Sequence, residues 1–472
     1  MIRSHTIALL LTSAGLTACA VGPDYQAPKL GLNTAFQAAP AATAALADGD
    51  GWWSGFQDAG LERVIARAGA QNLDIQQAGA RIGQSRAQAR LADAALLPKD
   101  EANAGAADVQ QSLMSPIGEI GRRLPGFERD YGLYQLGAAA SWEIDLFGGL
   151  RRQQQAARAE ALSVQDQAQA VRISVLAETA DAYLQARALQ ARLVLARRQA
   201  QVQDDRVSLI SRRAADGVSA DRDLNEAEAS REEVQASIPP LVAALDAQFN
   251  RLDVLMGAQP GTYRAEMLAP AAIPAPPPLS AAEGPAGLLR RRPDVRAAEH
   301  KLIAANARIG AALSDYYPKV TLASLIGGES IDSHRVLSSD SIQSQFGVGL
   351  RWRLFDFGRV DAEVAGARGR QAEALAGYRS AVLKASEEVE DAFSTLEQDQ
   401  SRVAALGRQV ERLTKARAQA QKAYEGGATG LIEVRDLDRE WLSASDQLVL
   451  AQASAARAAV AAFRALGGGW SA

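Results

Sequence analysis

Cysteine, histidine and aromatic residues are scarce in this chain of 472 residues, which has one Cys, three His and 5% aromatic residues. A single cysteine cannot form a disulfide within the chain. So few cysteine and histidine side chains also leave little for a transition-metal site or a Cys-His nucleophile. The sequence has no phosphate-binding loop, no glycine-rich dinucleotide turn and no nucleophile elbow. We therefore predict no catalytic residues, no bound metal and no cofactor, and we do not expect an enzyme.

Charge of one sign and long apolar runs are scarce as well. The formal net charge is −4, and this mild acidity gives no reason to expect nucleic acid as a partner. After Cys19 no stretch offers about 18 consecutive apolar residues, the length that a membrane-spanning helix needs. The sequence therefore predicts no transmembrane helix in the mature chain.

The first residues have the pattern of an export signal over residues 1–18. Arg3 precedes an apolar run at residues 7–16, which is too short to span a membrane. The residues Leu16 to Cys19 (LTAC) look like a bacterial lipobox, in which the cysteine thiol receives a diacylglyceryl group and becomes residue one after cleavage. The alternative is an ordinary signal peptide with a chance cysteine. We predict a covalent lipid on Cys19, an acylated N-terminal segment over residues 19–60, and anchoring by two or three acyl chains where one would be marginal. Ala20 at mature position two favours the outer membrane, by resemblance to bacterial lipoproteins.

The remainder of the chain is duplicated. Trp142 to Gly148 (WEIDLFG) recurs as Trp352 to Gly358 (WRLFDFG), 210 positions later, and a glycine turn recurs at the same offset. A period this long indicates a duplicated module rather than a solenoid repeat. We place the repeats at residues 61–257 and 285–468, joined by a Pro-rich connector at residues 258–284. Each repeat is expected to run helix, strand, strand, very long helix, turn, long helix.

The long helices are predicted at residues 150–257 and 357–468. Proline is absent between Pro125 and Pro239, and the helix-forming residues Ala, Gln, Arg, Glu and Leu dominate residues 150–215. Such a stretch would form a rod about 100 Å long, far beyond the mean globular helix of about 11–12 residues. The second copy has a heptad seam at Val389, Leu396, Val403 and Val410. The excess of alanine indicates helices with neighbours on two sides, as in a closed ring, or merely an alanine-rich genome.

Two turns and one interruption are expected in these helices. Gly217 and Gly427 can take the left-handed conformation that ends a helix. Ser219 and Thr429, which follow them, can cap the next helix. The Pro239-Pro240 pair is expected to interrupt and kink the returning helix of the first copy.

Four strands are predicted, at about residues 101–108, 134–147, 319–327 and 344–355. In the last strand, polar residues alternate with an apolar set made of Phe346, Val348, Leu350 and Trp352. This period of two is typical of a transmembrane barrel strand with a lipid-facing side, although an amphipathic strand of a soluble sandwich would show it too. Four strands cannot close a barrel, and lipid tolerates no open sheet edge. We therefore expect oligomers; three copies would supply twelve strands, but the sequence does not fix the number.

Several motifs resemble those of the TolC/OprM-like outer membrane factors, in the lipoprotein branch of tripartite efflux systems. They cover essentially the whole mature chain: CAVGPDY at residues 19–25, WWxxF at 52–56, NLDI at 72–75, RPDVR at 292–296, Tyr317-Pro318, and LFDFG at 354–358. The resemblance implies a homotrimer with a 12-stranded β-barrel in the outer membrane, continuous with a long periplasmic α-helical barrel. It also implies an exit duct that conducts small molecules passively. The implied partners are a periplasmic adaptor protein and an inner-membrane efflux transporter of a Gram-negative bacterium.

The resemblance further places the turns after Gly217 and Gly427 at a periplasmic tip that closes the duct. Family members often carry acidic residues at the positions of Glu433 and Asp436, which lie at i and i+3 on one helical face. In a trimer they would form anionic rings that favour cations. The alternative is a solvated helix face.

Other charges near the tip differ in their expected roles. Arg435 stands where an apolar residue is usual in the family, and it could pair with a neighbouring carboxylate. Asp223 and Glu226 hold the equivalent acidic positions in the first copy, outside the constriction.

Other functions remain open from the sequence. One is a non-conducting trimeric lipoprotein scaffold with the strands in a soluble head. Others are ducts for type I protein secretion or for metal export, the latter disfavoured by only four Met and two mature His. We expect Trp52, Trp53 and Phe56 to pack the N-terminal segment against the helices rather than to bind a ligand.

Overall fold

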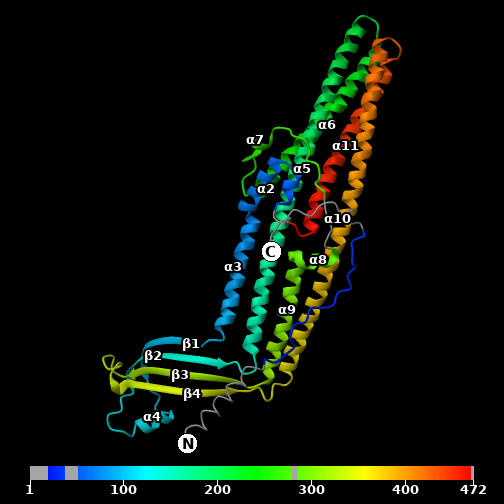
Figure 1. Cartoon of the computed structure of the whole chain (residues 1–472). Coiled ribbons are helices and arrows are strands. Elements are labelled where there is room, and N and C mark those ends of the chain that lie inside the picture. The colour runs from blue at the N-terminus through cyan, green and yellow to red at the C-terminus, as the bar shows by residue number, and fades with distance from the viewer. Residues whose placement is uncertain (1–19, 38–50, 279–283, 469–472) are drawn as a thin grey trace. The chain divides into compact units, whose positions relative to one another are not determined.

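The computed structural model describes residues 20–37, 51–278 and 284–468, so the predicted signal peptide and Cys19 lie outside the described residues. The chain forms two compact units (Figure 1). We call the first the sheet unit, which comprises Met1–Pro28, Gly83–Ser163 and Glu299–Gly377. The second, the helical unit, comprises Lys29–Ile82, Val164–Ala298 and Tyr378–Ala472.

The sheet unit contains one antiparallel sheet in the order β1-β2-β3-β4. Its strands are β1 (Lys99–Gln110), β2 (Asp130–Ile144), β3 (Lys319–Ser330) and β4 (Ile342–Arg351). Each repeat therefore contributes one hairpin, and the pairing of β2 with β3 joins the two hairpins. The short helix α4 (Pro116–Gly121) lies between β1 and β2, and the turn η3 (Ser339–Ser341) precedes β4.

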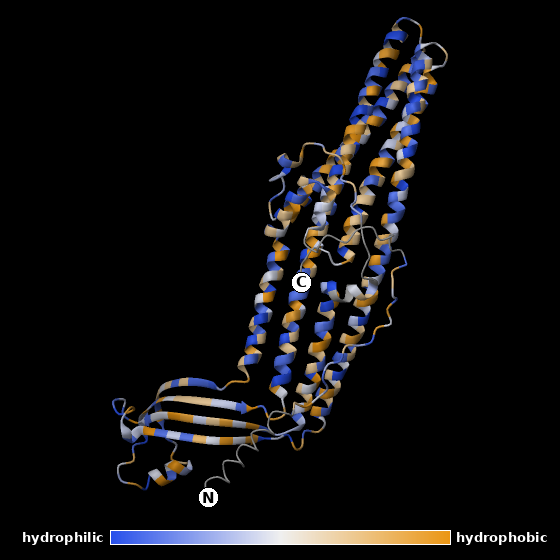
Figure 2. Ribbon diagram, in the orientation of Figure 1, coloured by the Kyte–Doolittle hydropathy of each residue, from blue (hydrophilic) through white to orange (hydrophobic). Residues whose placement is uncertain are grey.

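The register of the sheet collects apolar side chains on one face. Leu322 of β3 lies opposite Trp142 of β2 and Val348 of β4, and Ile326 lies opposite Ala138. Directly paired residues point to the same side of a sheet, so the even-numbered residues of β2, β3 and β4 share a face. The odd-numbered residues, such as Gln345, share the other. Figure 2 shows the strands banded in hydrophobic and hydrophilic colours.

The long helices that follow the strands have equal lengths in the two repeats. α5 (Gly149–Ala215) and α10 (Arg359–Glu425) each have 67 residues, and α6 (Asp221–Leu255) and α11 (Leu431–Ala465) each have 35. A helix of 67 residues is about 100 Å long. The other helices of the described residues are η1 (Trp52–Phe56), α2 (Ala59–Gln71), α3 (Leu73–Ala94), α7 (Arg264–Met267), α8 (Gly284–Arg291), α9 (Pro293–Leu313) and η2 (Ser314–Tyr316).

The core of the helical unit holds the N-terminal segment in place. Trp52 is buried and stacks on Phe463 of α11, with ring centroids 5.1 Å apart. Phe56 is buried in the same cluster, and Trp53 packs against it. Asp58 caps α2 by accepting from two backbone amides, and the hydroxyl of Tyr183 donates to it at 2.9 Å. The prediction that these aromatic residues serve packing is confirmed.

Helix α11 is rich in buried alanine, which permits close packing of its neighbours. It is also the one helix in the described part of the chain that is long and apolar enough to cross a membrane by composition. The criterion applied to the sequence, about 18 consecutive apolar residues, did not identify α11 as a candidate. Because 56% of its apolar window is buried inside the protein, the composition of α11 is that of a core helix.

The expected interruption at Pro239-Pro240 is wrong. Helix α6 continues through both prolines from Asp221 to Leu255. Residues 235–237 are exposed, so water can reach the backbone carbonyls that lose a helical partner.

Two glycines permit the close approach of β2 and β3. Gly137 and Gly327 are direct partners in the sheet, and a Cβ on Gly327 would lie 2.6 Å from the carbonyl oxygen of Leu136. A Cβ on Gly347 of β4, on the same face, would meet nothing within 4 Å.

We predict that Gly327→Ala destabilises the sheet by about 1–3 kcal/mol, as overpacking does. Gly347→Ala, the matched control, should leave stability unchanged or slightly raised. The melting temperatures of the two purified variants in detergent test this. Equal melting temperatures would contradict the close approach.

Candidate functional site

Both long helix hairpins end in the same glycine turn. Gly217 has φ 71° and Gly427 has φ 73°, the left-handed region that favours glycine. In the first turn the amide of Val218 donates to the carbonyl of Arg213 at 2.8 Å; in the second, Ala428 donates to Ala423 at 2.8 Å. This is the six-to-one bond of a glycine-ended helix. The structure thus places both predicted tip glycines at the predicted turns.

The expected caps of the returning helices are wrong. The N-cap residues are Ala220 and Gly430, and neither makes a side-chain cap bond. The hydroxyl of Thr429 instead donates to the carboxylate of Glu433. Thr429 therefore orients an acidic side chain of the tip.

Glu433 and Asp436 share one exposed face at the start of α11. They line a hollow of about 480 Å³ together with Glu440, which sequence reasoning missed. Its signal was its place at i+7 from Glu433, one more step along the same helical face. Asp436 lies 3.5 Å from Arg439, an exposed pair that contributes little. The face therefore presents three carboxylates to solvent.

Arg435 lies away from this hollow and faces the first helix hairpin. Its Nη2 is 4.0 Å from the Oε1 of Glu226 on α6. Glu226 is the first-copy equivalent of Asp436, so the structure brings Arg435 near a carboxylate of the first hairpin. Burial, and after it the charge of Arg435, lowers the pKa of the Arg206 guanidinium on α5, while Glu226 opposes this. Arg206, Glu226 and Arg435, which come from three different helices, therefore lie near one another and outside the acidic hollow. Asp223, the other acidic residue of the first copy, lies 3.5 Å from Arg222 instead.

A stronger link joins the hairpins further along. Arg192 of α5 donates to both carboxylate oxygens of Asp446 on α11, at 2.7 and 3.1 Å. The guanidiniums of Arg417 on α10 and Arg198 on α5 both lie over the ring of Trp441, at 5.2 and 6.0 Å from its centroid. No spacing in the sequence predicts the pairs of Arg192 with Asp446 and of Arg198 with Trp441, because they depend on the register between the two hairpins.

No described residue of the chain covers the apolar face of β4. The side chains of Phe346 and Val348 are each 74% exposed, Leu350 is 68% exposed and Trp352 is 51% exposed. Strands β1 and β4 each pair with a single neighbour in the described chain. A large uncovered apolar face marks an interaction surface. Trp352 lies one residue past the end of β4, which corrects its predicted place within the strand.

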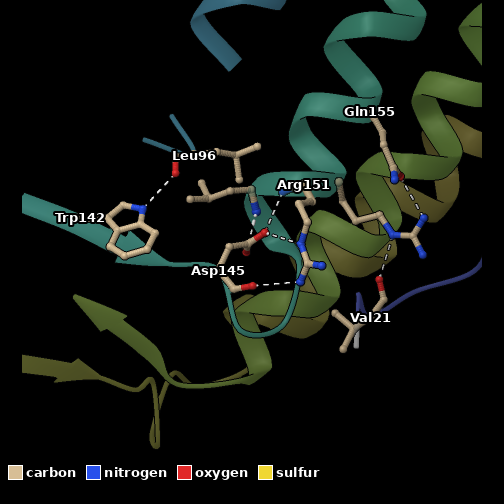
Figure 3. Close-up of polar contacts among 8 residues, drawn as sticks. Val21, Leu96, Trp142, Asp145, Arg151 and Gln155 are labelled. Atoms are coloured by element: carbon tan, nitrogen blue, oxygen red, sulfur yellow. Dashed lines mark hydrogen bonds and ion pairs between the residues drawn. The ribbon is translucent and has the colours of Figure 1, made fainter. Parts of the chain in front are cut away.

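Two tryptophans tie the base of the sheet to the helices in the same way. The indole nitrogen of Trp142 donates to the carbonyl of Leu96 at 2.9 Å (Figure 3). In the second repeat, Trp352 donates to Tyr316 at 2.9 Å. Each acceptor lies two residues before the proline that precedes a strand. Tryptophans with an apolar body and a satisfied N–H are typical of a membrane–water interface.

Comparison with known proteins identifies the class. The family model of outer membrane efflux proteins matches residues 64–258 and 285–468, and the chain belongs to this family. Outer membrane protein OprJ of Pseudomonas aeruginosa is 30% identical over 98% of this chain and 96% of its own length. The cation efflux system protein CusC of Escherichia coli is 26% identical over 96% of each chain. The solved structure of the outer-membrane channel OprN matches with a TM-score of 0.84 at 32% identity, covering 96% of this chain and 100% of OprN.

The protein is therefore an outer-membrane efflux channel of a Gram-negative bacterium. This confirms the predicted family, fold class and location, and the prediction that the chain is not an enzyme. Among the described residues, no group of His, Cys, Asp and Glu side chains is arranged to hold a metal ion.

Proposed function

We propose that the chain works as a homotrimer whose twelve strands form one β-barrel in the outer membrane. The observation that carries this proposal is the sheet itself, with an exposed apolar face and, within the part of the chain that the structure describes, a strand at each end that lacks a second partner. Lipid tolerates no unpaired strand edge, so the edges of β1 and β4 must be paired by other copies. The odd-numbered polar residues would then line the lumen.

The long hairpins would join in the same trimer as a ring of helices in the periplasm. There the duct would meet a periplasmic adaptor and an inner-membrane transporter, and it would conduct small molecules passively. A lipid on Cys19 would anchor it. The name of CusC mentions cation efflux, but this chain is poor in Met and His, which favours small organic molecules over metal ions.

The acidic face at the start of α11 would be the gate. In a trimer, Glu433, Asp436 and Glu440 would each recur three times around the axis. Like charges held close together repel one another and attract cations, so such rings favour cations and slow anions in a narrow opening. Arg435 and Glu226 would hold the two hairpins together behind this face.

We predict that Val348→Arg prevents assembly in the outer membrane. A charge on the lipid face of a barrel strand costs about 2–4 kcal/mol near the midplane. The quantity to measure is the amount of trimer in the outer-membrane fraction. Gln345→Arg is the matched control, because it adds the same charge to the opposite face of the same strand. If both variants assemble equally well, β4 does not face lipid. The better interpretation is then a scaffold in which the strands form a soluble head.

We also predict that the double variant Glu433→Ala/Asp436→Ala raises single-channel conductance by about twofold or more and weakens cation selectivity, because it removes two of the three anionic rings and leaves only that of Glu440. The measurement uses purified trimer in planar bilayers.

Asp221→Ala/Asp223→Ala is the control for the gate. It removes the same charge from the first turn of α6, on the other hairpin. An intact trimer with unchanged conductance in the α11 variant would rule out these residues as the gate.

A further inference from the structure

The loop between β1 and β2, residues 111–129, folds into a closed unit of its own. The backbone amide of Gln111 donates to the carbonyl of Arg129 at 2.8 Å, and the Nε of Arg129 donates to the carbonyl of Gln111 at 3.2 Å. Within this closure the hydroxyl of Ser115 accepts from the amide of Gly118 and caps α4. The side-chain amide of Gln111 donates to the same hydroxyl at 2.7 Å. The loop therefore holds α4 in a defined place.

Helix α4 turns its smallest residues towards the loop. Gly118 and Gly121 are the buried residues of the helix. A Cβ on Gly118 would collide with the carbonyl oxygen of Ser112, and a Cβ on Gly121 would collide with the ring of Phe127. The inner side of α4 thus has no room for larger side chains.

The large apolar side chains of the same helix point outward. Ile117 and Ile120 are 69% and 65% exposed, and they lie three residues apart, on one side of the helix. Met114 before the helix and Leu124 after it are also exposed. An apolar stripe that its own loop leaves uncovered marks an interaction surface.

Two arginines flank this stripe. Arg122 and Arg123 directly follow α4, and both are exposed. Neither guanidinium forms an ion pair with another described residue. The loop carries three Arg against two Glu, so it is positive in a chain whose formal net charge is −4. We call the six exposed residues the loop patch: Met114, Ile117, Ile120, Leu124, Arg122 and Arg123.

The sheet sets the level of the loop patch in the membrane. Gly132 of β2 lies ten residues before Trp142, the tryptophan at the base of the sheet. At about 3.3 Å per residue and a tilt of about 35–45°, this stretch rises by about 25 Å, the height of the apolar band of an outer-membrane barrel. Tyr134, an aromatic residue on the even-numbered face, marks the upper end of this stretch. Helix α4 lies at the end of the sheet away from α5 (Figure 1), so the loop patch lies where the outer leaflet meets water.

The charges of the loop patch decide between two covers for its stripe. A second copy that covered the stripe with its own stripe would bring the two pairs of Arg122 and Arg123 together, and like charges in contact disfavour such an interface. A lipid with acyl chains and phosphate groups matches both halves of the patch. Arginine binds phosphate through charge-assisted hydrogen bonds, and an apolar helix side packs on acyl chains at the headgroup boundary.

We propose that the loop patch binds lipid A, the acylated and phosphorylated base of the lipopolysaccharide in the outer leaflet. Arg122 and Arg123 bind its phosphates, and the stripe packs on its acyl chains. The bound lipid covers the stripe and keeps the β1–β2 loop at the membrane surface, outside the mouth of the duct. This rests on the proposed barrel, which sets the level of the loop.

Binding of diphosphoryl lipid A to the purified protein in detergent tests the site. The lipid bound per chain is measured by native mass spectrometry over a range of lipid concentrations. We expect Arg122→Gln/Arg123→Gln to raise the Kd by about tenfold or more, because it removes the charge-assisted bonds to phosphate. The native preference for diphosphoryl over monophosphoryl lipid A should disappear in this variant.

A second variant tests the apolar half of the patch. Ile117→Ser/Ile120→Ser should weaken the binding of both lipids by a similar factor, because acyl chains lose apolar contact area. The preference for the diphosphoryl form should remain. The replaced side chains are exposed, so the melting temperatures of both variants should equal that of the native protein.

Arg212→Gln/Arg213→Gln is the matched control. It removes another adjacent pair of exposed arginines, in the last turn of α5, and it should bind lipid A as the native protein does. An equal loss in this control would show attraction to any basic surface and overturn the proposal.

Unchanged binding in the loop arginine variant would overturn the proposal as well. So would an isoleucine variant that loses its trimer and keeps its lipid, because the stripe would then join copies of the chain. Lipid is counted per chain, so assembly is measured separately. A protein that stays a single chain and binds lipid A through Arg122 and Arg123 would count against the trimer and support the loop patch.

Discussion

The rest of the molecule depends on one constraint: the sheet of a single chain can neither pair both of its edge strands nor cover its own apolar face. Among the described residues, the four strands leave an unpaired edge at β1 and another at β4, and the apolar face of β4 is largely exposed. In water such a sheet would aggregate, and in lipid each open edge would leave N–H and C=O groups without partners. Both problems disappear when copies of the chain pair edge to edge and lipid covers the apolar face. An outer-membrane channel of this kind is therefore built by assembly.

The duplication shows how a small unit was adapted to this need. Each repeat brings a hairpin of strands, a tryptophan bonded to the carbonyl two residues before a proline, and a helix pair that turns at a left-handed glycine. The repeats differ at the tips. The second copy carries the exposed acidic face, whereas the first places Glu226 near Arg435 in the space between hairpins. The two repeats thus have the same backbone structure but different charges at their tips. This difference assigns the proposed gate to α11 and a supporting role to the helices of the first copy.

Much of this could be predicted from the sequence, because the signals were local and repeated. The tip glycines and the alternation of β4 followed from spacing and composition alone. The apolar face of β3 did not, since its residues alternate poorly and only the register with β2 and β4 assigns Leu322 and Ile326 to a side. The helix break at Pro239-Pro240 was a local rule that failed at an exposed site, where water can serve the freed carbonyls. The bond between Arg192 and Asp446 depends on which helices lie side by side, which no spacing in the sequence reveals.

Cross-linking of the strand edges would test the central claim most directly. Cys19 is the only native cysteine, so pairs of cysteines placed one on β1 and one on β4 would report on edge pairing alone. A disulfide needs Cα atoms about 4.4–6.8 Å apart, a distance found between paired strands. Oxidation of the membrane-inserted protein should give, for pairs in the correct register, covalent products of two and three copies and nothing larger. Products that remain single chains for every pair, or a ladder that continues beyond three, would contradict a closed barrel made by three copies.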